Sequence, residues 1–414
     1  MAVGGMVGGG IFSTLGVVVA ISGAWAWLSF FVAGLIALAA GYSYVVLSNR
    51  YGEGGGAFTF LREINAAGLA GSVAWILIVG YVLTNAVYAF TFGQYLGHVA
   101  DLGPWFPRAV GVAIIALFVG VNLRGVGEAG GVEVMLVWFK LAVLVALAGF
   151  GLYHWQPEML SRGVPDAGIA AALFGASSVF MAYEGFQLLT YDYDDIDNPR
   201  KTLPRAVLSA IIVVIAVYVM VTLGTTMLVG AEQVVKHKEV ALAIAGQHAL
   251  GTAGLVAVTL AAAFSTGSAI NATLFATARL AHTVAKGREL PSILDHKNAR
   301  GIPDRAVIVL GGASAILAAL GTLNSLVEAA SLSFLFTFCV VCSLAFRERA
   351  GWRVITGAGA IAAALACGAL MLRLSRTDPL ALAFVALMGL LAIIGRPLIL
   401  RHVQLDDGAG KGGQ

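Results

Sequence analysis

The chain has 414 residues, of which 59% are hydrophobic and 11% are charged, and its formal net charge at pH 7 is +3. Soluble globular domains carry about 25% charged residues, so this composition excludes a soluble protein and indicates an integral membrane protein. The small net charge gives no sign of nucleic-acid binding, and no nucleic-acid partner is expected.

Runs of apolar residues recur along the whole chain. Each is about 20 residues long, the length that crosses roughly 30 Å of hydrocarbon as a helix. We therefore predict an all-α polytopic membrane protein with about twelve transmembrane helices embedded in lipid. The expected spans are 2–22, 25–48, 72–98, 107–124, 132–153, 168–191, 204–229, 252–285, 303–321, 323–346, 353–372 and 379–398. The longest outer connection, 230–251, is expected to form a short helix over the outer face.

Lysine and arginine are distributed unevenly among the short loops between the spans. With the N-terminus inside, the inner loops hold about 17 of these residues and the outer loops about 6, and positive residues favour the cytoplasmic side. The sequence therefore predicts a multi-pass protein of the cytoplasmic membrane with both termini in the cytoplasm. Residues 1–401 are expected to form one membrane domain, and the tail 402–414 is expected to be disordered.

The first span begins with a glycine-rich stretch, because residues 4–16 read GGMVGGGIFSTLG. Each glycine costs roughly 1 kcal/mol relative to alanine in a helix, so the stretch favours an interruption of the span. Non-helical backbone at membrane depth survives only where it lines a cavity or packs on protein. A second interpretation is close helix packing, because Gly4 with Gly8, and Gly5 with Gly9, each satisfy a GxxxG contact.

A second interruption is expected in the sixth span, at Tyr183-Glu184-Gly185, where a charged residue and a glycine lie in mid-membrane. Two broken spans at corresponding positions of two halves are typical of an inverted-repeat transporter. This correspondence favours breaks over simple packing in the first span as well. It predicts two repeats of five spans, about 1–153 and 168–346, followed by additional helices at about 353–398.

Four ionisable residues fall within or at the ends of apolar spans: Lys140, Glu184, Glu328 and Arg279. A charge at the bilayer centre costs at least about 2.5 kcal/mol, so such residues are functional candidates by default.

The residues needed for enzymatic, metal or redox chemistry are not found in a suitable pattern. Cys339 and Cys342 form a CxxC, but there is no second pair, and the seven histidines lack ligand spacing on a common helix. No metal site and no cofactor are therefore expected. No nucleotide-binding motif and no interfacial nucleophile are found either, so neither an enzyme nor an ATP-driven pump is expected.

Four motifs in chain order resemble those of the amino acid–polyamine–organocation (APC) permeases. GGMVGGGIF (4–12) resembles the G-x-I-G-x-G-I-F signature of that superfamily, and FMAYEGF (180–186) resembles its F-x-A-[YF]-x-G-[FW] motif. DIDNPRKTLPRAV (195–207) is similar to the loop that follows, and 278–307 is similar to the loop after the eighth span. The resemblance covers nearly the whole chain, and the four motifs together are specific.

The resemblance implies a LeuT-like fold of five plus five spans, with a site for an amino acid between broken spans one and six. It implies that exposed N–H groups of residues 8–10 bind the substrate carboxylate, as a helix terminus binds anions. Backbone carbonyls near Val7 and at Phe180 and Tyr183 would receive the ammonium group, and Phe180 or Tyr183 would act as an aromatic lid. The implied substrate-binding residues are Val7, Gly8, Gly9, Gly10, Ile11, Phe180, Ala182, Tyr183, Glu184 and Gly185.

Lys140 lies where many relatives carry a lysine in the fifth span, and in a subset its ammonium occupies the site that sodium fills elsewhere. Burial disfavours the charged form of a lysine, so Lys140 is the candidate for proton coupling, with protons expected rather than sodium. An alternative is that Lys140 only pins neighbouring spans together. Ser265, Thr266 and Ser268 of the eighth span would line the same region, or would only pack there.

Glu184 departs from the family pattern, since most relatives have a small or apolar residue at that position. A carboxylate there would attract a cationic side chain or accept a proton during transport. The leading hypothesis is therefore a secondary active permease for amino acids that is proton-coupled and works by alternating access. The alternatives are a sodium-independent carrier or exchanger of amines, polyamines or cationic amino acids, and a sensor that does not transport.

Overall fold

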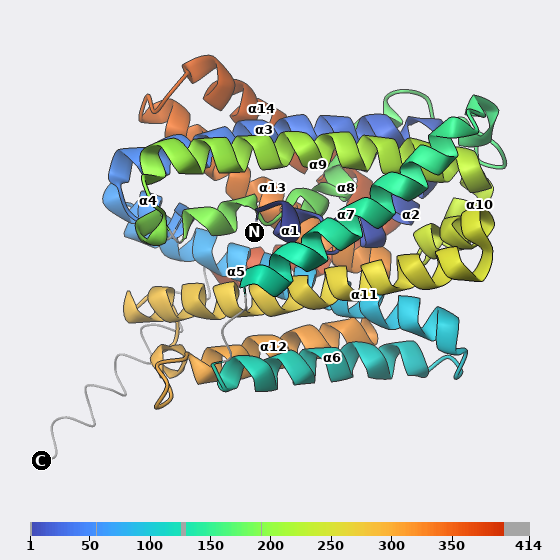
Figure 1. Cartoon of the computed structure of the whole chain (residues 1–414). Coiled ribbons are helices and arrows are strands. Elements are labelled where there is room, and N and C mark those ends of the chain that lie inside the picture. The colour runs from blue at the N-terminus through green and yellow to red at the C-terminus, as the bar shows by residue number, and fades with distance from the viewer. Residues whose placement is uncertain (1, 55, 126–129, 192, 393–414) are drawn as a thin grey trace, which may run out of the picture.

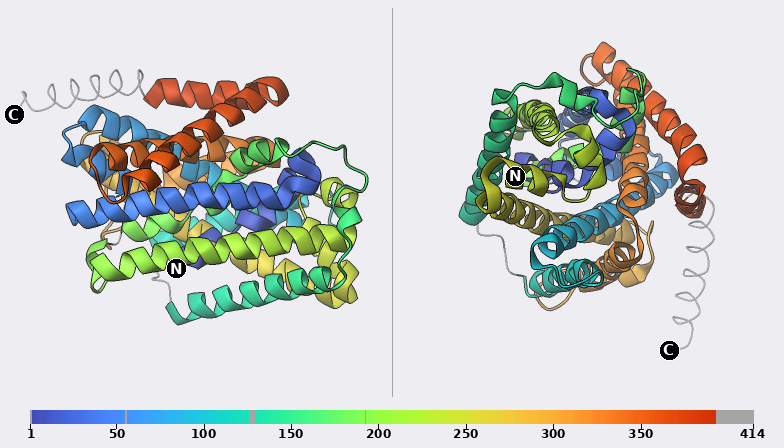
Figure 2. Two further views of the ribbon diagram at one scale, coloured as in Figure 1. Left: turned by 90° about the horizontal axis from the view of Figure 1, so that it is seen from above. Right: turned by 90° about the vertical axis from the view of Figure 1, so that its right-hand side faces the viewer.

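A computed structural model describes residues 2–54, 56–125, 130–191 and 193–392. Within these residues the regular secondary structure is entirely helical, as predicted, and it contains no strand. Most of the long helices lie side by side in one bundle, whereas α7 crosses its neighbours obliquely (Figure 1). The view along the bundle places the N-terminal segment among the surrounding helices (Figure 2). The glycine-rich start of the chain is therefore surrounded by protein.

The first five spans are built from seven helices. Between the second and third spans, the short helix α4 forms the connection. The bounds are α1 (Ala2–Met6), α2 (Gly10–Ser22), α3 (Ala26–Tyr51), α4 (Gly56–Glu63), α5 (Ala67–Ala100), α6 (Phe106–Leu123) and α7 (Gly130–Tyr153).

The remaining spans begin with a helix in three short pieces and end with two helices outside the repeat pattern. The bounds are α8 (Ala171–Ser178), η3 (Phe180–Tyr183), η4 (Phe186–Thr190), α9 (Pro199–Val229), α10 (Ala231–Lys236), α11 (Ala241–Lys286), α12 (Asp304–Leu320), α13 (Leu323–Arg347), α14 (Arg353–Thr377) and α15 (Pro379–Leu390). The expected span 379–398 is thus described to residue 392, and 393–398 and the tail 402–414 lie outside the described residues.

Helices at equivalent places in the two halves pack on each other. The second spans of the halves, α3 and α9, are in contact, and so are the third spans, α5 and α11, and the fourth spans, α6 and α12. The contact of α7 with α9 has its counterpart in the contact of α13 with α3. This pairing is the one expected for two interlocked sets of five spans.

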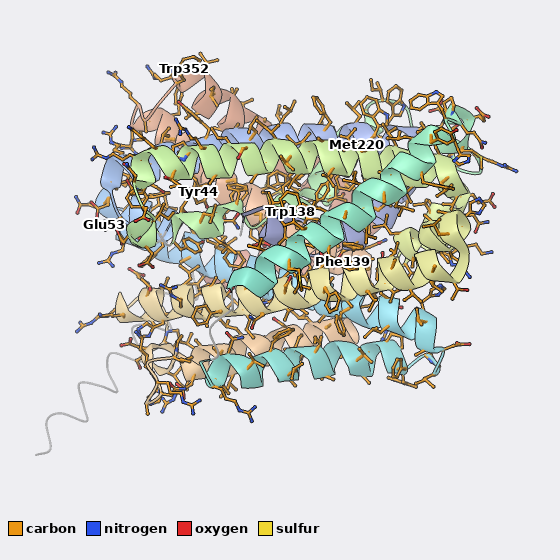
Figure 3. All side chains as sticks on the ribbon, viewed as in Figure 1. Tyr44, Glu53, Trp138, Phe139, Met220 and Trp352 are labelled. Carbon is orange, nitrogen blue, oxygen red and sulfur yellow. The ribbon has the colours of Figure 1, made fainter. Side chains whose placement is uncertain are left out.

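Eight helical stretches in the described parts of the chain are long and apolar enough to cross a membrane. The 17-residue α12 and the short pieces of the sixth span fall below that length. Large apolar side chains project outward from the bundle, as Figure 3 shows for Trp138 and Phe139 on α7. Trp138 is 70% exposed, which is the arrangement expected of a side chain that faces lipid.

The connection 230–251 forms two helical segments, where the sequence predicts a single short helix. The first is α10, and the second is the beginning of α11, which turns sharply at Leu250 and Gly251. Gly251 has φ +61°, a conformation that glycine adopts without strain. Beyond the turn, a side chain at Gly254 would collide with the carbonyl of Gly246, so the two segments are held in direct backbone contact. Glycine at these positions makes the sharp turn possible.

Close helix packing through glycine also joins α7 to α9. A Cβ added at Gly151 would collide with the backbone of Gly224, and one added at Gly224 would collide with the backbone of Ala148. Gly149 lies on the same helix but has nothing within 4 Å of an added Cβ.

We expect Gly151→Ala to lower the thermal stability of the detergent-solubilised protein by several degrees. The added methyl group forces α7 away from α9, and overpacking of this kind costs about 1–3 kcal/mol. Gly149→Ala is the matched control and leaves the melting temperature unchanged or raises it, because alanine favours the helix. Equal melting temperatures for the two variants would contradict the close contact.

Candidate functional site

The first helix break lies between α1 and α2, in the turn Val7–Gly9. The N–H of Gly8 donates to the carbonyl of Gly5 at 3.0 Å, three residues back, so the α-helical pattern ends there. A Cβ at Gly10 would collide with the hydroxyl of Tyr218 and lie 2.7 Å from the carbonyl oxygen of Ala182. No side chain caps α2 at Gly9, so its first N–H groups, which lack intrahelical partners, lie at the break.

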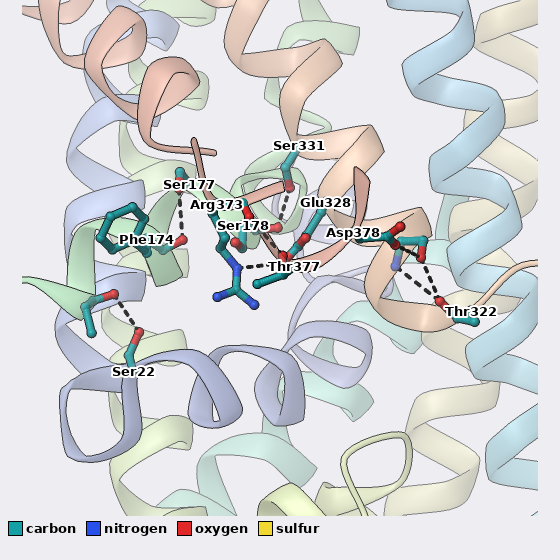
Figure 4. Close-up of polar contacts among 12 residues, drawn as sticks. Ser22, Phe174, Ser177, Ser178, Thr322, Glu328, Ser331, Arg373, Thr377 and Asp378 are labelled. Atoms are coloured by element: carbon teal, nitrogen blue, oxygen red, sulfur yellow. Dashed lines mark hydrogen bonds and ion pairs between the residues drawn. The ribbon is translucent and has the colours of Figure 1, made fainter. Parts of the chain in front are cut away.

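The second break interrupts the sixth span between η3 and η4. Glu184 is extended, with φ −64° and ψ 147°, and Gly185 has φ +121°, a conformation that favours glycine. Ser331 of α13 bridges the part of this span that precedes the break: it donates to the carbonyl of Ser178 at 2.8 Å and accepts from the N–H of Met181 at 3.0 Å. Figure 4 shows the bond between Ser331 and Ser178. Backbone groups freed near the break are thus paired inside the bundle.

The two breaks are in direct contact. A Cβ at Gly185 would lie 3.0 Å from the backbone of Gly5, so no side chain separates the two segments. The hydroxyl of Tyr218, on α9, lies 2.7 Å from the carbonyl oxygen of Met6 and 2.9 Å from that of Ala182. One hydroxyl hydrogen is therefore shared between a carbonyl of each broken helix.

Lys140 and Ser265 both donate to carbonyls at the first break. Lys140 of α7 is 1% exposed, and its Nζ donates to the carbonyl of Gly4 at 2.8 Å. Ser265 of α11 donates to the carbonyl of Val7 at 2.6 Å. Carbonyls at the C-terminal end of a helix carry partial negative charge, which favours a cation there. The structure thus brings the fifth and eighth spans to the end of α1.

Thr266 and Ser268, the other two hydroxyl residues expected near Lys140, donate within their own helix. Thr266 donates to the carbonyl of Ala262 at 2.7 Å, and Ser268 donates to the carbonyl of Ser265 at 3.1 Å. Of the three hydroxyl residues, Ser265 is therefore the one whose side chain bonds to the break.

Glu184 lies at the second break and is 2% exposed. Its Oε2 accepts from the hydroxyl of Tyr88 at 3.3 Å, and its Oε1 lies 3.5 Å from Nε2 of Gln187. The ring of Tyr88 also covers the first break, because a Cβ at Gly9 would collide with it. Tyr88 of α5 thus contacts both breaks.

The two aromatic residues expected to form a lid are anchored in the bundle. Tyr183 donates through its hydroxyl to the carbonyl of Phe30 on α3 at 2.7 Å. Phe180 packs edge-on against Phe338 of α13, with ring centroids 5.6 Å apart. Together with these two, all ten candidate substrate-binding residues are buried, so the candidate site is closed in this conformation.

The other two ionisable candidates are engaged elsewhere. Glu328 accepts from Nε of Arg373 at 3.0 Å, which joins α13 to α14 (Figure 4). Arg279 lies over the ring of Phe275, 5.7 Å from its centroid. Among the described residues, no group of three His, Cys, Asp or Glu is placed to hold a metal ion.

Sequence reasoning did not identify the side chains that connect the breaks to the rest of the bundle. They are Tyr88, Gln187, Tyr218 and Ser331, and each is a buried polar residue in an apolar span or beside the break. Polar residues in apolar spans indicate buried hydrogen bonds. That signal alone does not identify the bonding partners.

Three kinds of comparison relate the chain to known proteins: family models, individual relatives and solved structures. The family model described as amino acid permease matches residues 1–395. The chain is 32% identical to the inner membrane transport protein YbaT of Escherichia coli (strain K12), over 84% of this chain and 82% of YbaT. It is 23% identical to the serine/threonine exchanger SteT of Bacillus subtilis (strain 168), over 70% of this chain and 67% of SteT.

The third comparison, with solved structures, shows the fold. The crystal structure of MhsT in complex with L-phenylalanine is similar to this structure with a TM-score of 0.62 and 15% sequence identity. The match covers 98% of this chain and 96% of that one, and it confirms the predicted LeuT-like fold.

We expect Tyr218→Phe to lower the melting temperature of the solubilised protein, because it leaves two carbonyls at the breaks without their shared donor. Loss of a buried hydrogen-bond partner costs about 1–3 kcal/mol. Tyr153→Phe, at a residue that is 86% exposed, is the control and leaves the melting temperature unchanged. If Tyr218→Phe has the same melting temperature as the control, the hydroxyl of Tyr218 does not hold the breaks together.

Proposed function

The chain belongs to the amino acid permease family, and from that premise we propose that it is a secondary active transporter that works by alternating access in the cytoplasmic membrane. Its relatives YbaT and SteT are named as transporters, and this supports a transport role in place of an enzymatic one. We further propose that both termini are cytoplasmic, because lysine and arginine favour that side. Residues 1–153 and 168–346 are proposed as the two repeats, with α14 and α15 as additions.

The observation that carries the proposal is the uncapped start of α2 facing a second broken helix. The N–H groups of Gly9 and Gly10 are the proposed site of the substrate carboxylate, together with that of Gly8 once it leaves the carbonyl of Gly5, because a helix N-terminus attracts anions. The carbonyls of Val7, Phe180 and Tyr183 are the proposed site of the ammonium group. A zwitterion bound between the breaks would then meet N–H groups at one end and carbonyl oxygens at the other.

Closure of the site supports alternating access. All ten candidate residues are buried, so a substrate enters or leaves only if helices around the breaks move. The segment α1 is the proposed inner gate, because it is five residues long and its carbonyls are held by side chains of α7 and α9, while α11 holds the carbonyl of Val7 directly after it.

Lys140 is the proposed coupling residue. Its ammonium group holds α1 through the carbonyl of Gly4. Release of a proton from Nζ removes the charge from this bond, and charge-assisted hydrogen bonds are about twice as strong as neutral ones. Deprotonation would thus weaken the hold of α7 on α1 and favour opening on the inner side.

We expect uptake into proteoliposomes to require an inward proton gradient and to be lost in Lys140→Met. The panel contains radiolabelled serine, leucine, glutamate, lysine and putrescine, and serine is included because SteT is named a serine/threonine exchanger. Each compound is tested with a proton gradient, with a sodium gradient and with neither. The variant keeps the length of the side chain but has no proton to exchange, so accumulation falls to the level of protein-free liposomes.

Lys236→Met, the same exchange at an exposed residue of α10, is the control and accumulates substrate like the wild type. Accumulation driven by sodium, or undiminished accumulation by Lys140→Met, would show that Lys140 is structural.

A second candidate function is transport of cationic amino acids or amines, and Glu184 favours it. A buried carboxylate at the break is held by contacts of 3.3 and 3.5 Å, both longer than the usual hydrogen bond to a charged group. A substrate ammonium would compete with those contacts. Glu184 is also a proposed proton acceptor, in addition to Lys140.

Glu184→Gln tests this second function with two matched probes. Lysine and norleucine have the same four-carbon side chain, and only lysine has the terminal ammonium. If Glu184 binds that ammonium, the variant raises the KM of lysine relative to that of norleucine by roughly tenfold, the value of one hydrogen bond to a charged group. An unchanged ratio of the two KM values would leave neutral amino acids as the cargo.

A further inference from the structure

Gln187 is a fully buried residue of η4, two positions after Gly185. Its amide group contacts three neighbours. Oε1 accepts from the N–H of Gly185 at 3.0 Å, and Nε2 lies 3.0 Å from the hydroxyl oxygen of Tyr81. Nε2 also lies 3.5 Å from Oε1 of Glu184. One side chain therefore connects the second break, its carboxylate and helix α5.

The orientation of this amide follows from its partners. A backbone N–H only donates, so the oxygen of Gln187 faces Gly185 and the NH2 group faces the other two neighbours. The NH2 group has two hydrogens, one for the hydroxyl oxygen of Tyr81 and one for the carboxylate of Glu184. Tyr81 accepts in this arrangement, so its own hydrogen points to the hydroxyl of Tyr191, 3.0 Å away. The hydrogen bonds therefore run from Gln187 to Tyr81 and from Tyr81 to Tyr191.

Gln187 is held more closely than the carboxylate it faces. Its contacts with Gly185 and Tyr81 are both 3.0 Å, whereas Glu184 is contacted at 3.3 Å by Tyr88 and at 3.5 Å by Gln187. Hydrogen bonds weaken as the distance between their atoms grows. The donor is therefore fixed, and the carboxylate beside it is held weakly enough for a cation to replace the neutral donor.

We propose that Gln187 is a specificity-determining positioning residue, whose NH2 group is the resting partner of Glu184 and competes with the cationic group of a substrate. The proposal rests on the proposed substrate site between the two breaks. It predicts that the strength of this donor tunes the preference for cationic over neutral substrates. The bond to Gly185 has a separate effect, since it stabilises the break for every substrate.

Two variants separate these effects. Gln187→Glu keeps an acceptor for the N–H of Gly185 and replaces the amide donor with a second carboxyl beside Glu184. Two buried carboxyls this close share one proton, which leaves the pair when a cationic substrate binds. We expect Gln187→Glu to lower the KM of lysine roughly three- to tenfold while the KM of norleucine stays within a factor of about two. Gln187→Met keeps the side-chain length and loses the contacts with Gly185, Tyr81 and Glu184. We expect it to reduce the maximal rate for both probes and also to lower the KM of lysine relative to norleucine.

The deciding measurement is the lysine-to-norleucine KM ratio in four proteins: wild type, Gln187→Met, Glu184→Gln and the double variant. If Gln187 acts through Glu184, the effect of Gln187→Met on the ratio disappears in the Glu184→Gln background. An equal effect in both backgrounds, or an equal effect on both probes, overturns the proposal. Gln247→Met, the same exchange at an exposed residue of α11, is the control.

The same proteins are titrated with lysine and norleucine by thermal shift in detergent, which gives an affinity ratio without transport. Binding of both probes without uptake by the wild type contradicts the proposed transport function and still measures the effect of Gln187. If the wild type takes up substrate but the ratio of the lysine and norleucine affinities is the same in all four proteins, the role of Gln187 is contradicted. The proposed transport function is then unaffected.

Discussion

Backbone polar groups released from a helix inside a membrane need partners, because lipid supplies none. The two breaks release such groups at the ends of α1, α2, η3 and η4. Side chains from four surrounding helices pair with several of them: Lys140 of α7, Tyr218 of α9, Ser265 of α11 and Ser331 of α13. The positions of these helices around the breaks are therefore tied to the hydrogen bonds that the breaks require.

This requirement also explains where the chain needs residues without side chains. The hydroxyl of Tyr218 reaches both breaks because Gly10 leaves room for it, and the ring of Tyr88 covers the first break because Gly9 does. Glycine thus weakens the helix and also leaves room for the side chains that pack on the break and bond to its backbone. The break and the packing that sequence reasoning set against each other coexist here, since Gly8 would also collide with Ala269 if it carried a Cβ.

Hydropathy predicted the elements well, because a span needs a minimum length of apolar residues whatever it packs against. The expected span 323–346 corresponds to the helix Leu323–Arg347, and 107–124 to Phe106–Leu123. The Tyr-Glu-Gly sequence predicted an interruption of the sixth span. It did not predict that residues 180–190 would be 3-10 helix on both sides of the break, because that conformation depends on bonds to α13 and α5.

The candidate site was predictable only in part for the same reason. Lys140 and Glu184 stand out as charges in apolar sequence, and the structure places both beside a break. The partners of Glu184 do not stand out, because a tyrosine or glutamine in a helix has no local pattern that names its neighbour. Tyr88 lies 96 residues before Glu184, and the two residues meet because the fold packs α5 against both breaks. In the absence of a fold, such a pair is one of many that the sequence allows.

The contact between Gly5 and Gly185 has a mechanical consequence. Where flexible side chains lie between two segments, changes of rotamer can absorb small displacements of one segment against the other. Here no side chain lies between the two backbones, since even a Cβ added at Gly185 would lie 3.0 Å from the backbone of Gly5, so no rotamer change can absorb a shift of α1 toward η4. Gly185 also has φ +121°, where a larger residue would be strained. A substitution at Gly185 would therefore both strain the backbone and disrupt the contact with Gly5. The two broken helices, 180 residues apart in sequence, are in contact through these glycines, so a displacement of one helix displaces the other.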